Sequence, residues 1–220
     1  MSLLGIVIFL MILEWVVVAK KWKRLRVITK PAPMIAMILW FSLVGGWQGP
    51  LFYFGMGLVF SMLGDILLLL SFRYFVFGLL AFSFAHFFYI VGFNVTLPEF
   101  GTAFWVLLAG VLIIGITNFR PILNAMRKDR YQRRLITPVV FYGILISLML
   151  FSAFLNIARP GWGLWDGLSS CLGAGLFYVS DSLLARERFI RSSKLGPVLI
   201  MVTYLLGQLL ITAGVLIHYR

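Results

Sequence analysis

Eight long apolar runs dominate the sequence, most of them close to the ~20 residues that a helix needs to cross a bilayer. They cover 2–19, 33–48, 51–72, 74–96, 101–118, 136–155, 164–185 and 197–218, and the second is the shortest. Hydrocarbon offers no water to bond the backbone, so such runs form helices. A transmembrane β-barrel would need short strands of alternating polarity, and these runs are continuous. The sequence therefore predicts an all-α integral membrane protein: a single bundle of eight transmembrane helices forming one domain over 1–220.

The composition excludes a soluble protein. Hydrophobic residues make up 62% of the 220 residues and only 12% are charged, which is more apolar surface than a soluble domain can bury. The net charge of +12 would suit nucleic acid, but the basic residues lie in short loops between the apolar runs, so we expect no nucleic-acid partner. Cys171 is the one cysteine and lies within an apolar run, which argues against a disulfide or a cysteine metal site.

The basic residues fall into two unequal groups. Seventeen of the 19 Lys and Arg residues lie in connections 20–32, 119–135 and 186–196 or at Arg73. By the positive-inside rule these connections face the cytoplasm, which places both termini on the non-cytoplasmic side. We expect a multi-pass protein of a bacterial inner membrane whose basic loops touch anionic membrane lipids. The sequence indicates no oligomeric state.

Two aspartates stand inside apolar runs. Asp65 lies in "SMLGDILLLL" (61–70) and Asp181 in "FYVSDSLLA" (177–185). An ionisable side chain costs at least ~2.5 kcal/mol to insert at the centre of a membrane helix, so each is a candidate for function.

Helix geometry gives the depth of these groups. At ~1.5 Å of rise per residue, Asp65 lies roughly 12 Å and Asp181 roughly 7–8 Å from the basic residues that close their runs. Glu14 lies roughly 9 Å and His86 roughly 20 Å from the same end. Three carboxyl groups from three helices therefore share one half of the membrane. This predicts one polar cavity that opens toward the cytoplasm or the inner leaflet.

Further polar residues share a helix face with these groups, because residues three or four apart lie on the same side of a helix. The companions are Ser61 beside Asp65, Tyr89 beside His86, Tyr178 beside Asp181, Tyr204 and Gln208 on the last run, and Lys30 in "TKPAP" at the mouth of the second. We predict that they and Glu14 line the cavity, with Lys30 placed to hold a lipid phosphate. The alternatives are that the polar groups only bond helices together, that Glu14 balances the basic loop, and that Lys30 is a topology signal.

Two carboxyl groups in a dry cavity suit acid–base chemistry. Burial and a nearby like charge keep one carboxyl protonated while its partner is ionised. We predict Asp65 and Asp181 as catalytic residues for a hydrolysis that passes through a cation. A zinc site built from both aspartates and His86 is less favoured, since hydrolytic zinc sites are often richer in histidine. A serine triad lacks its G-x-S-x-G turn, and no metal or other cofactor is predicted.

Four stretches together resemble the YhhN family of membrane proteins, the lysoplasmalogenases. They are "SMLGDILLL" (61–69), "GLLAFSFAHFFYIVGF" (78–93), "GAGLFYVSDSLLA" (173–185) and "YLLGQLLI" (204–211). The eight-run layout and the Lys30–Pro31 pair are also similar, and the likeness covers essentially the whole chain. One departure is Gly207, where the family leads us to expect alanine more often. The resemblance implies hydrolysis of the vinyl ether bond of a lysoplasmalogen, a lysophospholipid, to a fatty aldehyde and a glycerophospho-ethanolamine or -choline; related ether lipids or lysophospholipids are alternative substrates.

Three other functions use the same residues. A small-molecule or proton-coupled transporter would employ Asp65, Asp181 and His86 as a relay, and a weak likeness between "GDILL" and "SDSLL" favours an internal repeat of that kind. Eight runs in 220 residues leave little mass for alternating access. An intramembrane aspartyl protease would need Gly-x-Gly-Asp and Tyr-Asp signatures that are missing here. The last alternative is a lipid-binding protein without catalysis.

Overall fold

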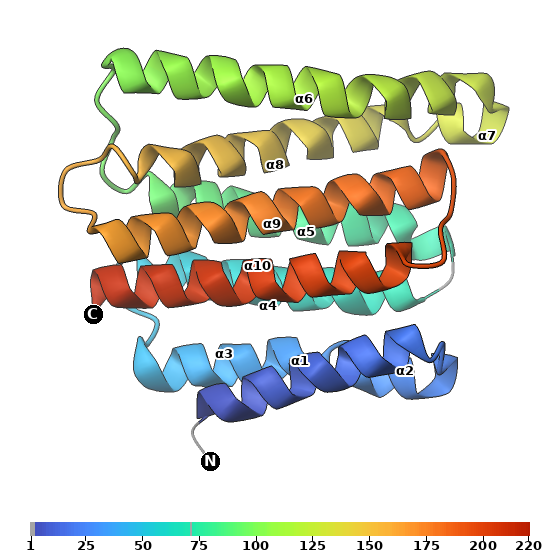
Figure 1. The fold of residues 1–220 in the computed structure, drawn as a ribbon, viewed down its shortest axis with the longest axis horizontal. Coiled ribbons are helices and arrows are strands. Elements are labelled where there is room, and N and C mark those ends of the chain that lie inside the picture. Colours follow the sequence, from blue (N-terminus) through green and yellow to red (C-terminus); the bar gives the residue numbers. More distant parts are fainter. Residues whose placement is uncertain (1–2, 71) are drawn as a thin grey trace.

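The computed structural model describes residues 3–70 and 72–220, and every regular element in them is a helix (Figure 1). The elements are α1 (Leu3–Ala19), α2 (Lys23–Thr29), α3 (Ala32–Val44), α4 (Leu51–Leu69), the 3₁₀ turn η1 (Phe72–Tyr74), α5 (Phe75–Phe93), α6 (Thr102–Lys128), α7 (Arg130–Arg133), α8 (Ile136–Leu155), α9 (Leu164–Phe189) and α10 (Gly196–Tyr219). Residue 2 of the predicted run 2–19 and residue 71 of the run 51–72 lie outside the described residues. The all-α membrane architecture is confirmed.

The predicted count of eight spans is not confirmed. Seven helical stretches in the described part of the chain are long and apolar enough to cross a membrane. The first helix, α1, has 17 residues, which is about 26 Å at ~1.5 Å per residue and short of the ~30 Å hydrocarbon core. The second predicted run is lengthened instead: α2 and α3 together form a 22-residue stretch, Lys23–Val44, interrupted at Lys30 and Pro31.

Two helices continue beyond their predicted runs. The helix α6 extends to Lys128 and passes through Pro121, whereas the apolar run was predicted to end at 118. The helix α9 extends to Phe189, four residues past the predicted boundary at 185. Hydropathy marks where the hydrocarbon ends, and a helix that satisfies its own backbone continues into the polar zone.

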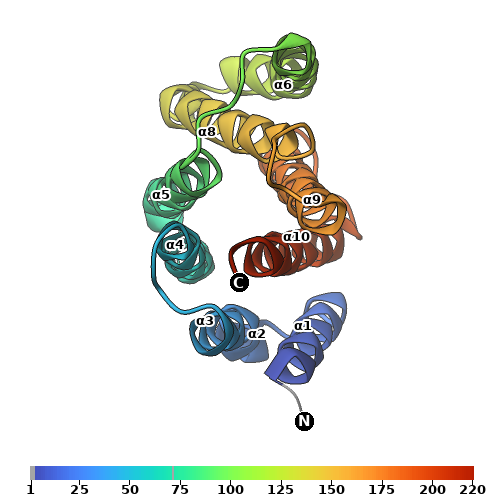
Figure 2. The same ribbon diagram turned by 90° about the vertical axis from the view of Figure 1, so that its left-hand side faces the viewer.

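Most of the helices form a closed ring when viewed along the bundle (Figure 2). Successive contacts run from α1 through α3, α4, α5, α8, α9 and α10 and return to α1. The helix α6 lies outside this ring, against α8 and α9. The space enclosed between α4, α5, α9 and α10 is where polar side chains from distant parts of the sequence meet.

The two ends of the bundle differ in charge. Figure 1 shows the first turn of α1 and the last turn of α10 toward one end of the bundle, and the connecting residues 20–22, 72–74, 129–135 and 190–195 at the other. These connections hold or adjoin most of the basic residues, so we call this end the basic end. The arrangement fits the predicted topology, and the assignment of the basic end to the cytoplasm stays a prediction.

Candidate active site

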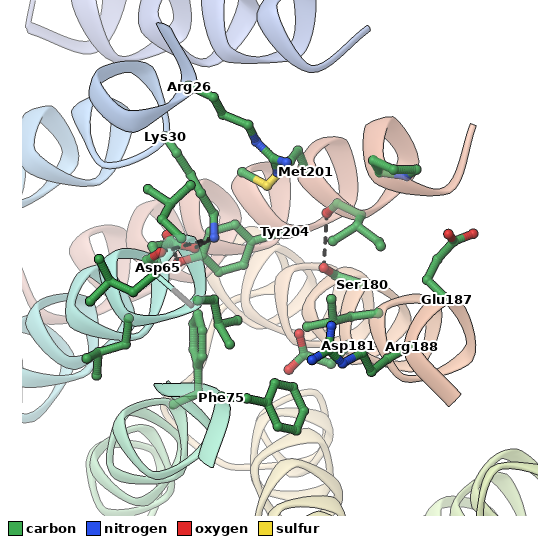
Figure 3. A pocket seen from close by; sticks show the side chains of 18 residues that line it. Arg26, Lys30, Asp65, Phe75, Ser180, Asp181, Glu187, Arg188, Met201 and Tyr204 are labelled. Carbon is green, nitrogen blue, oxygen red and sulfur yellow. Dashed lines mark hydrogen bonds and ion pairs between the residues drawn. The ribbon is translucent and has the colours of Figure 1, made fainter. Parts of the chain in front are cut away.

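A cavity of about 360 Å³ opens between α4, α5, α9 and α10 at the basic end. Asp65 on α4 and Asp181 on α9 both line it, although they lie more than a hundred residues apart in the sequence. Figure 3 shows Lys30 and Tyr204 converging on Asp65, with Asp181 on the other side of the cavity. The structure therefore brings both predicted catalytic residues to one enclosed space.

Asp65 is bound on both of its oxygens. Its Oδ1 lies 3.1 Å from Nζ of Lys30, and its Oδ2 accepts a hydrogen bond of 2.7 Å from the Tyr204 hydroxyl. Asp65 is only 2% exposed and Lys30 6%. Lys30 reaches this depth because the helix breaks at Lys30 and Pro31, between α2 and α3. Lys30 thus supplies the positive charge that balances an ionised Asp65.

Asp181 is one end of a hydrogen-bonded series of three side chains from three helices, with Tyr142 in the middle and His86 at the other end. The Tyr142 hydroxyl, on α8, donates to Oδ2 of Asp181. The same hydroxyl lies 2.9 Å from Nε2 of His86 on α5, and His86 Nε2 is 3.7 Å from Asp181 Oδ2. Because the Tyr142 proton is directed at Asp181, Nε2 of His86 is the donor to the phenol oxygen. His86 is fully buried, and its Nδ1 has no hydrogen-bond partner among the described residues.

The two aspartates therefore have different surroundings. Asp65 is held by an ammonium group and a phenol, whereas Asp181 contacts a phenol that is itself bound to an imidazole. The Asp181 side chain is also more open, at 12% exposed against 3% for Asp65. Unequal surroundings are what separate an acid from a base when both are carboxyl groups.

Six predicted site residues are not among the described residues that line the cavity: His86, which contacts Tyr142, then Ser61, Tyr89 and Gln208, and also Glu14 and Tyr178. Tyr89 donates to Oε1 of Gln208 (2.7 Å), and Nε2 of Gln208 donates to Ser61 Oγ (2.8 Å). All three are fully buried, and none is among the described residues that line the cavity. Their hydrogen bonds join α4, α5 and α10, so the structure gives them a helix-bonding role.

Glu14 also lies away from the cavity lining, as a counter-charge. Its Oε1 is 3.2 Å from Nε of Arg26, and its Oε2 accepts a 2.5 Å hydrogen bond from Thr29. Glu14 is fully buried on α1. It ties α1 to α2 and holds Arg26, which does line the cavity.

Tyr178 lies on the side of Asp181 that faces away from Asp65. It is 5% exposed, and its hydroxyl has no hydrogen-bond partner among the described residues. It lines a separate small apolar pocket that Asp181 also borders. The predicted neighbourhood of Tyr178 and Asp181 therefore exists, but it lies away from Asp65.

The three candidate metal ligands are divided between the two sides of the cavity. His86 lies beside Asp181, and Asp65 is engaged by Lys30 and Tyr204. No group of three or more His, Cys, Asp and Glu side chains within residues 3–70 and 72–220 is arranged to hold a metal ion. The expectation of a reaction without a metal stays a prediction.

Comparison with known proteins identifies the family. Residues 25–215 match the model of the YhhN family. The chain belongs to the YhhN family. The resemblance to the YhhN family predicted from the sequence is thereby confirmed.

The curated relatives of this YhhN protein share one description. A mouse protein named lysoplasmalogenase TMEM86B is 29% identical over 210 residues, which span 93% of this chain and 80% of the mouse protein. Human lysoplasmalogenase TMEM86B is 31% identical, over 72% of this chain and 61% of its own length. Human lysoplasmalogenase TMEM86A is 30% identical, over 70% of this chain and 61% of its own length. No solved structure matches the chain significantly.

Tyr142 of this YhhN protein was not predicted as a site residue from the sequence. It sits in "FYGILISL" with no acidic or histidine residue at helical spacing, so no pattern on its own helix marks it. Only the packing of α8 against α5 and α9 brings its hydroxyl to His86 and Asp181.

Gly207, the departure from the expected family pattern, lies at a close contact between the backbones of α9 and α10. A Cβ there would be 2.8 Å from the carbonyl oxygen of Gly173 and 2.9 Å from the backbone nitrogen of Phe177. Backbone atoms cannot swing aside as side chains do, so the YhhN protein needs glycine at this position to keep α10 against α9. The residues that follow, including Gln208, are positioned by this contact.

Proposed function

We propose that this YhhN protein is a membrane lipid hydrolase that cleaves the vinyl ether bond of lysoplasmalogens in the cavity between Asp65 and Asp181. The observation that carries the proposal is that two aspartates with different partners, Asp65 buried and Asp181 partly exposed, line one cavity at the basic end of the bundle. The relatives named lysoplasmalogenase support the substrate. The proposal places the protein in a bacterial inner membrane with the cavity facing the cytoplasmic leaflet.

Asp181 is the proton donor in this proposal. A vinyl ether reacts when its β-carbon is protonated, which leaves an oxocarbenium ion at the carbon bound to oxygen. Asp181 delivers that proton from Oδ1 while Oδ2 keeps its bond from Tyr142. The Tyr142 and His86 pair then stabilises the carboxylate that remains, and it orients Asp181 through the next protonation.

Asp65 stabilises the cation and directs water to it. As a carboxylate balanced by Lys30, it presents negative charge where the oxocarbenium ion develops. Water adds its oxygen to the cationic carbon and passes one proton to the Asp65 carboxylate, giving a hemiacetal. The hemiacetal hydroxyl then gives its proton to the Asp181 carboxylate, Asp65 gives its proton to the ether oxygen of the glycerol, and the bond between carbon and that oxygen breaks. Both carboxyl groups are thereby returned to their starting protonation states. The products are a fatty aldehyde and a glycerol hydroxyl. Glycosidases also use two carboxyl groups to stabilise an oxocarbenium-like transition state.

The mouth of the cavity matches a zwitterionic headgroup. Arg26 and Arg188 line it together with Glu187. Guanidinium groups bind phosphate through charge-assisted hydrogen bonds, and a carboxylate suits the ammonium of ethanolamine or choline. We assign the phosphate to the two arginines. Arg26 contacts Glu14 through Nε, and the guanidinium group has further N–H donors on its other two nitrogens, whereas the single ammonium group of Lys30 is buried against Asp65.

Aldehyde release by the purified protein in detergent tests the proposed function. We expect aldehyde from a lysoplasmalogen, none from an acyl lysolipid without the vinyl ether, and the same rate after incubation with a chelator. A rate that the chelator abolishes would refute the acid-pair mechanism. No aldehyde from folded protein, together with solute flux into liposomes that contain it, would favour the transporter alternative.

Tyr142→Phe removes the donor to Asp181 and the contact to His86. We expect kcat for aldehyde release to fall by about ten- to a hundredfold, because a hydrogen bond to a charged group contributes about 1.5–3 kcal/mol. Tyr89→Phe is the matched control: it deletes another buried phenol, bonded to Gln208 away from the cavity, and we expect it to reduce thermal stability with little change in kcat. Equal kcat losses in both variants would contradict a specific role for Tyr142.

A further inference from the structure

A small apolar pocket lies behind Asp181, on the side away from Asp65. We call it the annex; it measures about 40 Å³, room for little more than one water-sized group. Most of its lining is apolar and includes Leu79, Val139 and Ile146. The residues that line both the annex and the catalytic cavity are Leu68, Phe75, Phe82, Asp181, Leu184 and Arg188. A hydrocarbon chain bound at Asp181 would therefore contact mostly apolar side chains in this direction, whereas the mouth of the cavity is lined by charged ones.

A second, larger hollow lies on the outer face of the ring, between α6 and α8. This outer groove measures about 550 Å³ and is lined largely by apolar residues, among them Leu108, Leu112 and Ile144. Few other helices pack around this groove, because α6 lies outside the ring and contacts chiefly α8 and α9. The groove is long and apolar, which suits an extended hydrocarbon chain.

Phe119 on α6 is the residue that separates the annex from the outer groove, and it lines both. Its ring packs on Gly143 of α8, where an added Cβ would lie 2.7 Å from Cζ of Phe119. It also meets the edge of the Tyr178 ring, with centroids 6.4 Å apart. The adjacent Asn118 donates to Ser182 Oγ at 2.5 Å, which fixes this part of α6 against α9. Rotation of one side chain, Phe119, would join the two spaces.

We propose that the annex and the outer groove form the subsite for the alkenyl chain of the substrate, with Phe119 as the residue that sets chain-length preference. The inference rests on the proposed function and specifies where its substrate lies. The vinyl ether sits at one end of a long unbranched chain, so a chain whose β-carbon is at Asp181 must continue in one direction. The annex alone is far too small for it, and the outer groove is the continuation.

Two variants shift the chain-length preference in opposite directions. Phe119→Ala opens the passage, so we expect the ratio of kcat/KM for a long-chain over a short-chain lysoplasmalogen to rise about tenfold, the scale of discrimination by a hydrophobic pocket. Gly115→Phe fills the outer groove from its open side, where only Ser147 Oγ lies within 4 Å of an added Cβ, at 3.6 Å. We expect this variant to lower the same ratio by about tenfold, with the short-chain rate unchanged.

Ile113→Ala is the matched control, because Ile113 lies on α6, is 63% exposed and lines neither hollow. Thermal unfolding in detergent shows whether each variant is folded, and an unfolded Phe119→Ala would leave Gly115→Phe as the deciding variant. A ratio that stays at the wild-type value in the folded variants would overturn the proposal. A change of the same size in the chain-length ratio of Ile113→Ala would also overturn it.

A binding experiment separates this inference from the proposed function. An alkyl-ether lysolipid with a photoreactive group at the end of its chain cannot be hydrolysed as a vinyl ether. We expect it to label peptides of α6 and α8 around Gly115 and Ser147, and labelling confined to α4 and α10 would overturn the subsite. Wild-type protein that releases no aldehyde but is labelled in the groove would refute the reaction and keep the chain subsite.

Discussion

We expect aldehyde release from a lysoplasmalogen to fall by about 10²–10⁴-fold in Asp181→Asn and in Asp65→Asn, the range that general acid–base groups contribute. Asparagine keeps the size of the side chain and can still accept the bonds from Tyr142 and Tyr204, so the loss reports the missing acid or charge. The measurement is kcat/KM for the purified variants in the same detergent.

Asp166→Asn is the matched control for both aspartate variants. Asp166 lies on the same helix as Asp181 but at the opposite end of the bundle, where it contacts His218 at 2.8 Å. We expect it to keep most of the wild-type rate below its melting temperature. The double variant at Asp65 and Asp181 should be little worse than either single one, because groups that act as a unit give non-additive losses. Near-wild-type activity in either single variant would contradict the acid-pair mechanism.

The sequence was sufficient to locate the cavity along the bundle axis. Asp65, Asp181 and Lys30 each lie a countable number of residues from a basic connection, and helix rise converts that count into depth. Depth and charge asymmetry together predicted that these groups meet near one end, and the structure places all three on one cavity. The order of the helices around the ring was not needed for this.

The sequence was not sufficient to predict the direction in which each polar group points. Helices that are apolar on every face carry no stripe that marks an inner side, so the facing of Ser61, Tyr89 and Gln208 toward each other became visible only in the folded bundle. Tyr142 was missed for the same reason. The role of Lys30 also depended on a break in the helix at Pro31, which a run of apolar residues does not reveal.

We expect Lys30→Met to destabilise the folded protein by about 3–5 kcal/mol, because removing one partner of a buried ion pair leaves the other charge uncompensated. The side chains of Lys30 and Asp65 are 8% and 3% exposed, so little water is present to replace the lost ammonium. The measurement is the unfolding transition in detergent. Lys23→Met, a change at an exposed residue of α2, is the matched control and should shift stability by only a few tenths of a kcal/mol.

A second substitution separates the two interpretations of Lys30. If its main partner is Asp65, then Lys30→Met combined with Asp65→Asn removes both charges and should recover most of the stability while remaining inactive. If Lys30 instead holds the lipid phosphate, Lys30→Met alone should raise KM with little effect on unfolding, and the second change would recover nothing. The buried 3.1 Å contact to Asp65 favours the first outcome. The phosphate would then bind Arg26 and Arg188 at the mouth of the cavity. Arg188→Met should raise KM with little change in the unfolding temperature, whereas Arg26→Met also leaves the buried Glu14 without its ion-pair partner and should lower the unfolding temperature as well.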